Sequence, residues 1–558
     1  MTAGRMLAVL AAGAGCGSAG ALPAARFDNA PAALVVDDRR EVIKRPEVWT
    51  DLQDLDGFDA EIERPIIRPL ELPRQRRALG VNAVDEVPDS TWFTNRIGVR
   101  DLTADEVRRG PASELGPEQF TPWTVHDTKP GGTDAGLMIT DTRGVKYMLK
   151  FDSGDRAELE SATHVIVNRL LWACGYHVPD DRIVFARLED LRIAPGAKIK
   201  QRNGRVTGTL TQAELEHGLA RVAHSSDGRI RVLASRWLDG TSLGGPSREG
   251  VRRGDPNDRI PHELRRDLRG EYPILAWLDH VDMTRGNSVD MWVRDAQDPG
   301  RHYVEHYQVD FGLALGVMGS KLHDLHYGHT YELDYADVVR TLVTLGLHDG
   351  PRGRPEAPRL RGVAAMFVTD GFDPGTWHTD VPYIPFDTAD RFDKFWGATV
   401  MARFSRDQIR AAVDAGALSD PGAVDYLVDT LVARQQATLR YWFAQVNPVA
   451  HATAARDGDG AAVCFDDLAV KAGLVTAAAT RYRIATYDPD ARRLGPDLEI
   501  AAARGGRTCV ARPLSTAGDG YTILEIETRR PEVSGRTYVH VARDRETAQP
   551  RVIGIWRT

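Results

Sequence analysis

The stretch Trp277-Leu-Asp-His-Val-Asp282-Met-Thr-Arg-Gly-Asn287 is followed, at residues 309–312, by Val-Asp310-Phe-Gly. An aspartate thus stands five residues before an asparagine, and a second aspartate closes an apolar, strand-like run. Carboxylate and amide oxygens are the ligands that hard divalent cations prefer. The two stretches therefore predict one polar site that is assembled from two loops of the chain.

The composition limits the domain organisation and the partners that we expect. The chain has 558 residues, of which 42% are hydrophobic and 27% charged, so it can bury a large core and form more than one domain. A net charge of −8 gives no broad attraction to nucleic acid or to anionic lipid, so no nucleic-acid partner is expected. Nothing after residue 25 is apolar for long enough to span a bilayer.

The first 25 residues resemble an export signal. Arg5 precedes a short run of small and apolar residues, Met6 to Ala14, and an Ala-x-Ala pattern follows. Cys16 is a candidate for lipidation after cleavage, although Gly13 stands where a lipobox usually has leucine. We expect the protein to be exported to the periplasm or cell envelope, with a lipid anchor as an option. The alternative is a disordered Ala/Gly-rich tail.

Three cysteines lie beyond this segment. Cys174 falls in a predicted helix, where it serves most simply as a small buried hydrophobic residue. Cys464 and Cys509 would form a disulfide in an oxidising compartment, and two unpaired buried thiols are the alternative.

Hydrophobic periodicity divides the chain into four parts after the export segment. Residues 26–120 form an irregular extension that we expect to pack on the domain after it. Residues 121–240 combine strands with one helix, residues 241–448 are mostly helical, and residues 449–558 contain short strand-like runs. The pattern predicts an α+β fold with a β-rich N-lobe, a helical C-lobe and a small C-terminal β domain. Helices are predicted at Ala157–Cys174, Asp334–Leu347, Thr388–Phe404, Ser405–Gly416 and Asp420–Phe443.

Two features of the β-rich part suit a phosphate group. Lys150 ends the third predicted strand, where it can hold phosphates, although such a lysine alone would be read as a solvated strand-edge residue. The loop before the second strand contains Gly131, Gly132 and Gly136. Glycines let the backbone approach a phosphate closely, but they also suit a plain hairpin turn.

In this order, a hairpin with a Gly-containing loop, a strand lysine, a helix, Asp-x4-Asn and Asp-Phe-Gly resemble the elements of protein kinases. The chain is similar to atypical bacterial kinase-like proteins of the HipA and spore-coat CotH type, which lack the His-Arg-Asp motif. It resembles still more an uncharacterised group of bacterial kinase-like proteins. The resemblance runs from about residue 86 to 448, on Glu86–Arg96, Leu149–Asp152, Ala173–Pro179, Asp255–Asp258, His262–Arg266 and the Asp282 stretch.

The resemblance implies that ATP and Mg²⁺ or Mn²⁺ bind between two lobes, and that the γ-phosphoryl group passes to a hydroxyl of an unknown protein or small-molecule acceptor. It implies a catalytic base at Asp282 and metal ligands at Asn287 and Asp310. It implies that Lys150 holds phosphates and that Glu160 orients Lys150.

The helix after Lys150 departs from the kinase pattern. Glu158 and Glu160 are candidates for the partner of this lysine, but both lie in the first turn, where acidic residues also complement the helix dipole. Counted from the end of the helix, the expected glutamate falls nearer His164. A histidine there would not pair with Lys150 in the same way. A second hypothesis is therefore a catalytically weak or dead pseudokinase that acts as a binding module in the cell envelope.

A third hypothesis rests on a histidine cluster. His323, His326 and His329 recur at short spacing just after Asp-Phe-Gly, and imidazoles can bind zinc. Together with Asp282 they would suit a metal-dependent hydrolase. The spacing would splay the side chains on a helix, and Gly328 favours a loop instead. The alternative is a polar loop near the substrate entrance.

Overall fold

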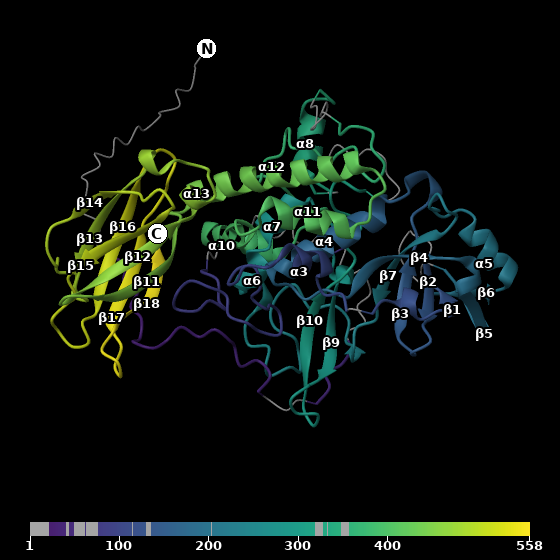
Figure 1. The fold of residues 1–558 in the computed structure, drawn as a ribbon, viewed down its shortest axis with the longest axis horizontal. Helices are drawn as coiled ribbons and strands as arrows, with labels where there is room; N and C mark the ends of the chain where they lie inside the picture. The colour runs from purple at the N-terminus through teal and green to yellow at the C-terminus, as the bar shows by residue number, and fades with distance from the viewer. Residues whose placement is uncertain are drawn as a thin grey trace, which may run out of the picture.

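A computed structural model describes residues 22–40, 44–48, 58, 62, 76–113, 115–129, 136–201, 204–318, 327–331, 333–347 and 356–558. Three regions follow one another along the molecule: a sheet at one end, helices in the middle and further sheets at the other end (Figure 1). The mixed composition of helices and sheets agrees with the predicted α+β class. The export segment up to residue 21, Cys16 included, lies outside the described residues. No helix in the described ranges is long and apolar enough to cross a membrane.

The first region is a seven-stranded sheet in the order β4-β7-β3-β2-β1-β5-β6. All its neighbouring strands are antiparallel except β1 and β5. Its inward side chains, such as Trp123, Val125 and Leu149, alternate with more exposed ones and form a separate core. The strands are β1 (Trp123–Thr128), β2 (Gly136–Thr140), β3 (Lys146–Lys150), β4 (Asp181–Ala186), β5 (Leu191–Lys200), β6 (Val206–Thr209) and β7 (Ile230–Arg236).

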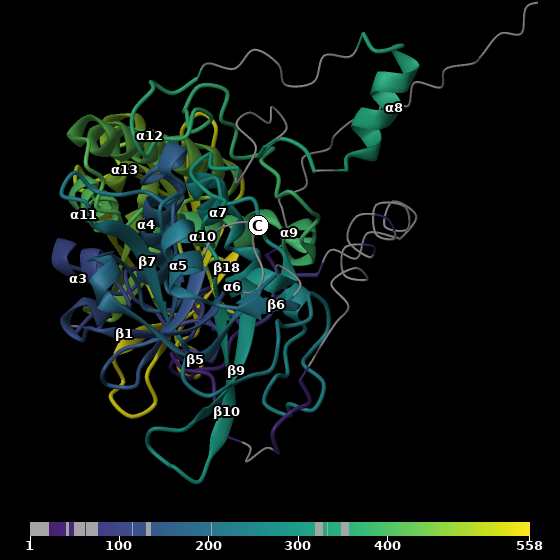
Figure 2. The same ribbon diagram turned by 90° about the vertical axis from the view of Figure 1, so that its right-hand side faces the viewer.

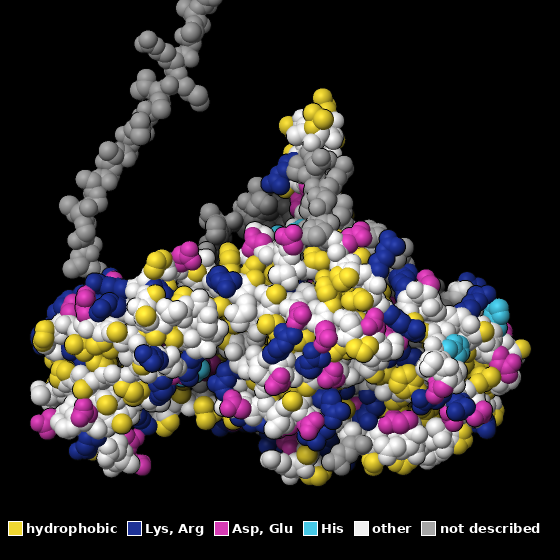
Figure 3. Space-filling model, turned by 45° about the horizontal axis from the view of Figure 1, so that its top comes forward, with side chains coloured by type: hydrophobic (Ala, Val, Ile, Leu, Met, Phe, Trp, Pro, Cys, Tyr) yellow, Lys and Arg dark blue, Asp and Glu magenta, His cyan; other side chains and the backbone are white. Residues whose placement is uncertain are grey.

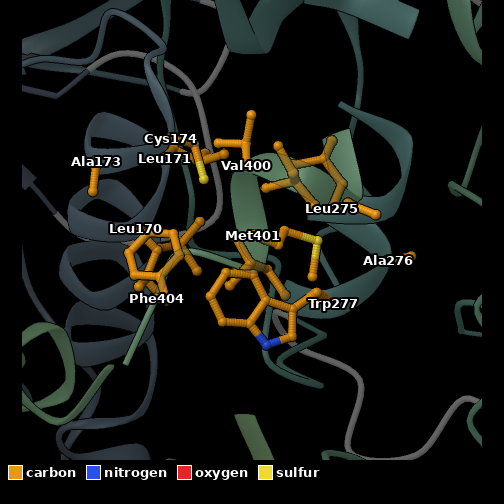
Figure 4. Close-up of a cluster of buried hydrophobic side chains, with 14 of the residues drawn as sticks. Leu170, Leu171, Ala173, Cys174, Leu275, Ala276, Trp277, Val400, Met401 and Phe404 are labelled. Atoms are coloured by element: carbon orange, nitrogen blue, oxygen red, sulfur yellow. The ribbon is translucent and has the colours of Figure 1, made fainter. Parts of the chain in front are cut away.

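The central helices share one large core. Helix α5 (Gln212–Leu219) packs in the core of the seven-stranded sheet. The central helices are α3 (Ala104–Arg109), α4 (Leu159–Cys174), α6 (Arg266–Arg269), α7 (Tyr272–Leu278), α9 (Ile384–Thr388), α10 (Arg391–Met401), α11 (Arg406–Ala415) and α12 (Pro421–Gln445). Figure 4 shows Leu170 and Leu171 of α4 packed with Trp277 of α7 and Met401 of α10. The core therefore fixes α4, which follows the lysine strand, against α7, which leads to Asp282. The helices predicted to begin at Ser405 and Asp420 are confirmed: Ser405 forms a capping box with Gln408, and the Asp420 side chain accepts from Gly422.

Helix α8 (Tyr335–Val343) stands away from the rest of the molecule (Figure 2). The side chains of Leu342, Leu345 and Leu347 are 69%, 90% and 86% exposed. Figure 3 shows hydrophobic side chains at the tip of this projection. The helix predicted from the apolar periodicity is present. Its apolar face is not covered by the described part of the chain.

The last region contains two sheets, in the orders β11-β12-β15 and β14-β13-β16-β17-β18. Cys464 and Cys509 occupy opposite positions on β12 and β15 and form a disulfide, whereas Cys174 is free and buried. The elements are β11 (Val449–Asp457), β12 (Gly460–Asp467), α13 (Leu468–Lys471), β13 (Arg481–Tyr487), β14 (Leu498–Ala501), β15 (Arg507–Arg512), β16 (Thr522–Arg529), β17 (Thr537–Arg543) and β18 (Pro550–Arg557).

The N-terminal segment joins this last region to the centre. The amide of Asn29 donates to Asp519, 2.7 Å away, beside the C-terminal strands. Further along, the carboxylate of Asp38 accepts hydrogen bonds from the backbone and hydroxyl of Thr91. The extension was predicted to pack on the domain that follows it in sequence. Its later part does so, since Trp92, Phe93 and Val107 lie in one core with side chains of α4, whereas residues 22–40 lie partly against the C-terminal sheets.

Candidate functional site

A small hairpin brings together the two polar stretches of the sequence. Strand β9 (Ser288–Arg294) pairs antiparallel with β10 (His302–Gln308), with β8 (Thr241–Ser242) on the other side of β9. Ser288 lies opposite Gln308, so the residues just outside the hairpin also meet. The backbone N–H of Val309 donates to the carbonyl of Asn287 at 2.9 Å. Antiparallel pairing therefore places Asn287 and Asp310 at the same end of the hairpin.

The loop between α7 and β9 carries Asp282. The side-chain amide of Asn287 donates to the carbonyl of Asp282 at 2.9 Å, which closes the five-residue loop between them. Burial raises the pKa of the Asp282 carboxyl, and hydrogen bonds from Asn287 and Thr284 offset part of the effect. A carboxyl group with a raised pKa suits a proton acceptor.

Lys150 and Asp310 meet at the centre of the site. The Lys150 ammonium donates to Oδ1 of Asp310 at 2.6 Å, although the two residues are 160 positions apart. Burial lowers the pKa of Lys150, but the Asp310 carboxylate more than offsets this, and the pKa is raised. Desolvation raises the pKa of Asp310, but Lys150 and His164 outweigh it and hold that pKa well below its usual range. Both groups are therefore charged at neutral pH.

The backbone around Asp310 is unusual. Asp310 has φ of 63°, in the left-handed region that Asp and Asn tolerate better than most residues. The next residue, Phe311, is fully buried, with its ring centroid 5.2 Å from that of His164 and 6.0 Å from that of His280. The buried ring anchors the segment, so the Asp310 side chain stays directed at Lys150.

The two glutamates of α4 have different surroundings. Glu158 pairs with Arg361 at 3.0 Å and accepts hydrogen bonds from Ser419, so its carboxylate is engaged away from the lysine. Glu160 lies close to the Asp-Phe-Gly segment, since a Cβ added to Gly312 would come within 2.8 Å of its Oε1. Its charge helps to raise the pKa of Lys150, although the hydrogen bond of this lysine goes to Asp310. The orienting role of Glu160 stays a prediction.

His164 occupies the place that the helix length assigned to a glutamate. Its Nε2 lies 2.8 Å from Oδ2 of Asp181 on β4, and its Nδ1 lies 3.9 Å from Oδ1 of Asp310. No motif in the sequence singles out Asp181. A histidine and a strand aspartate thus lie near Asp310, where the resemblance in sequence led us to expect a glutamate.

The glycine loop is described only at its end. Gly131 and Gly132 lie outside the described residues. Gly136 opens β2 opposite Lys150, and a Cβ on it would come within 2.5 Å of the Leu149 carbonyl oxygen and 2.8 Å of Lys129. Close packing therefore explains the glycine at position 136, and its contact with a phosphate stays a prediction.

The histidine cluster also falls mostly outside the description. His323 and His326 lie outside the described residues, and His329 lies within them. In the described ranges, no three or more His, Cys, Asp and Glu side chains gather so that they could hold a metal ion. The hydrolase hypothesis stays a prediction.

The residues at the end of the hairpin fit a hard divalent cation. Asp310 is charged and 45% exposed at its side chain, and Asn287, whose backbone carbonyl accepts from Val309 next to Asp310, carries a side-chain amide oxygen. Charged carboxylates and neutral amide oxygens are the donors that Mg²⁺ and Mn²⁺ take, with nucleotide phosphates completing the shell.

Comparison with known proteins adds two distant structural similarities. A Golgi casein kinase structure with Mn/ADP bound is 9% identical, with a TM-score of 0.29, over 60% of this chain and 74% of that one. A second Golgi casein kinase structure is also 9% identical, with a TM-score of 0.28, over 73% and 92%. No protein-family model and no curated protein matches the chain. Similarity this low carries no argument, and membership of the bacterial kinase-like group stays a prediction.

Glu271 next to the site should make stability depend on pH. It is fully buried, Gln308 donates to its Oε1, and burial raises its pKa to about 8 from an ordinary 4.5. Between these values the unfolded chain is ionised here while the folded protein keeps the proton, so stability falls as pH rises toward 8. We expect Glu271→Gln to unfold at a higher temperature than the wild type at pH 8 and at the same temperature near pH 5.

The matched control is Glu189→Gln, because the side chain of Glu189 is 75% exposed. It should leave the difference between pH 5 and pH 8 unchanged. Thermal unfolding followed by circular dichroism at several pH values measures both variants. Equal unfolding temperatures for Glu271→Gln and the wild type at pH 8 would contradict the assignment.

Proposed function

We propose that this chain is an atypical kinase-like protein with two lobes, residues 121–240 and 241–448, which binds ATP with Mg²⁺ or Mn²⁺ between them. It transfers the γ-phosphoryl group to a hydroxyl of a protein or small-molecule acceptor. The observation that carries the proposal is the 2.6 Å hydrogen bond between Lys150 and Asp310. It joins a strand lysine to the aspartate of Asp-Phe-Gly. Two motifs that occurred by chance would not be expected to meet in the fold.

Each residue of the site has a chemical task in this proposal. Asp310 and Asn287 hold the metal, which neutralises phosphate charge when it is bound. Lys150 holds the phosphates, and its buried stem keeps the ammonium in place. Asp282 accepts the proton of the attacking hydroxyl, in line with its raised pKa.

The sharpest test separates nucleotide binding from transfer. Asp282→Asn keeps the size of the side chain and removes the proton acceptor. We expect ATP and Mg²⁺ to bind this variant as they bind the wild type, while transfer of ³²P from labelled ATP falls by at least about a hundredfold. Calorimetry measures the binding, and incorporation into the protein itself or into envelope extract measures the transfer. Unchanged transfer in Asp282→Asn would remove Asp282 from the mechanism.

One observation favours a second candidate, the pseudokinase. His164, not a glutamate, lies next to the Lys150–Asp310 pair, with its Nδ1 3.9 Å from Oδ1 of Asp310. In this case the wild type binds ATP without transferring phosphate to any acceptor, and Asp282→Asn is indistinguishable from it. The same experiment therefore decides between the two functions.

We also propose export of the protein to the periplasm or cell envelope. The signal-like residues 1–25 and the disulfide Cys464–Cys509 support this, because disulfides persist in oxidising compartments. Mass spectrometry of the protein from fractionated cells should find a shortened N-terminus and, without reduction, a linked Cys464–Cys509 peptide. An intact N-terminus in the cytoplasmic fraction would refute export.

A further inference from the structure

Asp181 is a buried carboxylate that the proposed roles do not use. It opens β4 and is completely inaccessible to solvent. Its Oδ2 lies 2.8 Å from Nε2 of His164 and accepts a hydrogen bond from the amide of Asn168 at 3.2 Å. Its Oδ1 has no hydrogen-bond partner in the described part of the chain. A carboxylate in such a place requires a nearby positive charge.

The sheet register places Asp181 on the same face as Lys150. Asp181 lies opposite Ser235 of β7, and Ser235 lies opposite Met148 of β3. Residues directly opposite one another point to the same face, and so do residues two apart on one strand. Asp181 and Lys150 therefore share the face on which His164 of α4 contacts Asp181.

The charges around Lys150 agree with this placement. Burial lowers the pKa of Lys150, while the carboxylates of Asp310, Asp181 and Glu160 raise it, with Asp181 contributing more than Glu160. Two further side chains lie near Asp310: His164, 3.9 Å away, and Lys129, which lowers the pKa of Asp310. Lys150 hydrogen-bonds Asp310 directly, and Asp181 reaches this pair through His164, which lies 2.8 Å from the Asp181 carboxylate.

Arg169 of α4 also fixes the position of Asp181. The guanidinium of Arg169 donates to the Asp181 carbonyl and to the side-chain oxygen of Asn168. Asn168 in turn donates to the Asp181 carboxylate. Helix α4 therefore fixes both the backbone and the carboxylate of Asp181 through three of its side chains.

We infer that Asp181, held by His164 and Asn168, is the buried carboxylate that positions Lys150, in the place where a kinase-like helix would supply a glutamate. Asp181 and His164 are positioning residues, since they act through Lys150. The inference rests on the proposed function only in treating Lys150 as the lysine that holds phosphates. It accounts for the histidine on α4 without requiring the site to be inactive.

A double-mutant cycle on the nucleotide-free protein tests the coupling. Asp181→Asn should lower the unfolding temperature of the wild type, because Lys150 loses a counter-charge. In a Lys150→Met background the same change should be less destabilising, because one of the two cations near Asp181, Lys150 and Arg169, is already absent. Glu160→Gln in both backgrounds is the matched control, and its two shifts should differ less. Equal shifts for Asp181→Asn in both backgrounds would overturn the inference.

A second measurement reports on positioning itself. We expect Asp181→Asn to weaken the binding of a fluorescent ATP analogue with Mg²⁺ about tenfold. His164→Gln retains a hydrogen-bond donor toward Asp181 and should bind more tightly than His164→Phe, which has none. This pair decides the question if Asp181→Asn does not fold, and equal affinities of the two would count against the inference. A wild type that binds no nucleotide refutes the proposed function, while the unfolding cycle still decides the role of Asp181.

Discussion

Replacing Asp310 by asparagine should weaken Mg²⁺-dependent ATP binding at least about a hundredfold and abolish phosphoryl transfer with it. Asparagine has nearly the same shape and tolerates the left-handed backbone that Asp310 adopts at φ 63°. The change therefore removes one negative charge with little strain. Asp310→Ala would add backbone strain to the loss of charge, which makes it the less informative variant.

The metal dependence makes this test specific. In the presence of EDTA, Asp310→Asn should bind ATP at least as tightly as the wild type, because without a cation the Asp310 carboxylate repels the phosphates. Titration calorimetry with and without Mg²⁺ measures the four affinities. Asp370→Asn, an exposed aspartate in a turn, is the matched control and should behave like the wild type. Wild-type affinity of Asp310→Asn in Mg²⁺ would remove this residue from the metal site.

The second large effect is expected at Trp277, which lies in the core on α7, the helix that leads to the loop with Asp282. It is fully buried, and its indole N–H donates to the carbonyl of Leu431 at 2.8 Å. Its own carbonyl accepts from Arg434 at 3.0 Å, so it joins α7 to α12 in two ways. Trp277→Ala should cost about 4 kcal/mol of stability, because it leaves a large cavity and removes the hydrogen bond to Leu431.

Two variants show whether the cavity or the hydrogen bond causes the loss. Trp277→Phe keeps most of the volume and loses only the hydrogen bond, so it should cost about 1 to 2 kcal/mol. Trp237→Ala removes a tryptophan that is 52% exposed and should change stability by no more than about 0.5 kcal/mol. Urea unfolding followed by circular dichroism measures all three. A loss for Trp277→Ala no larger than for Trp237→Ala would contradict this packing role.

The local sequence was sufficient to predict elements whose hydrogen bonds form between residues close together in the chain. The capping box at Ser405 and the Asp420 cap begin helices where they were predicted, because a cap is formed within a few residues. The amphipathic run around Leu342 also forms a helix, α8. Whether its apolar face is covered depends on distant segments, and the described chain leaves it exposed.

Pairing between distant strands could not be predicted in the same way. The sequence left open whether Cys464 and Cys509 are linked, and the register of β12 against β15 places them opposite one another. The extension at residues 26–120 was expected to pack on the domain after it. Its later part does, but its start lies against the C-terminal sheets, where Asn29 donates a hydrogen bond to Asp519 in the turn before β16.

Part of the candidate site could be predicted from the sequence, and part depends on contacts between distant segments. The sequence by itself determined that Asp282, Asn287 and Asp310 belong together, because their short spacings surround a single hairpin. Only the tertiary structure decided which charges surround Lys150. The partners come from Asp310, 160 residues away, and from Asp181 on a strand that reaches Lys150 through β7. The order of strands in a sheet is set by packing of the whole chain, so a lysine and its buried carboxylate carry no mutual signature in sequence.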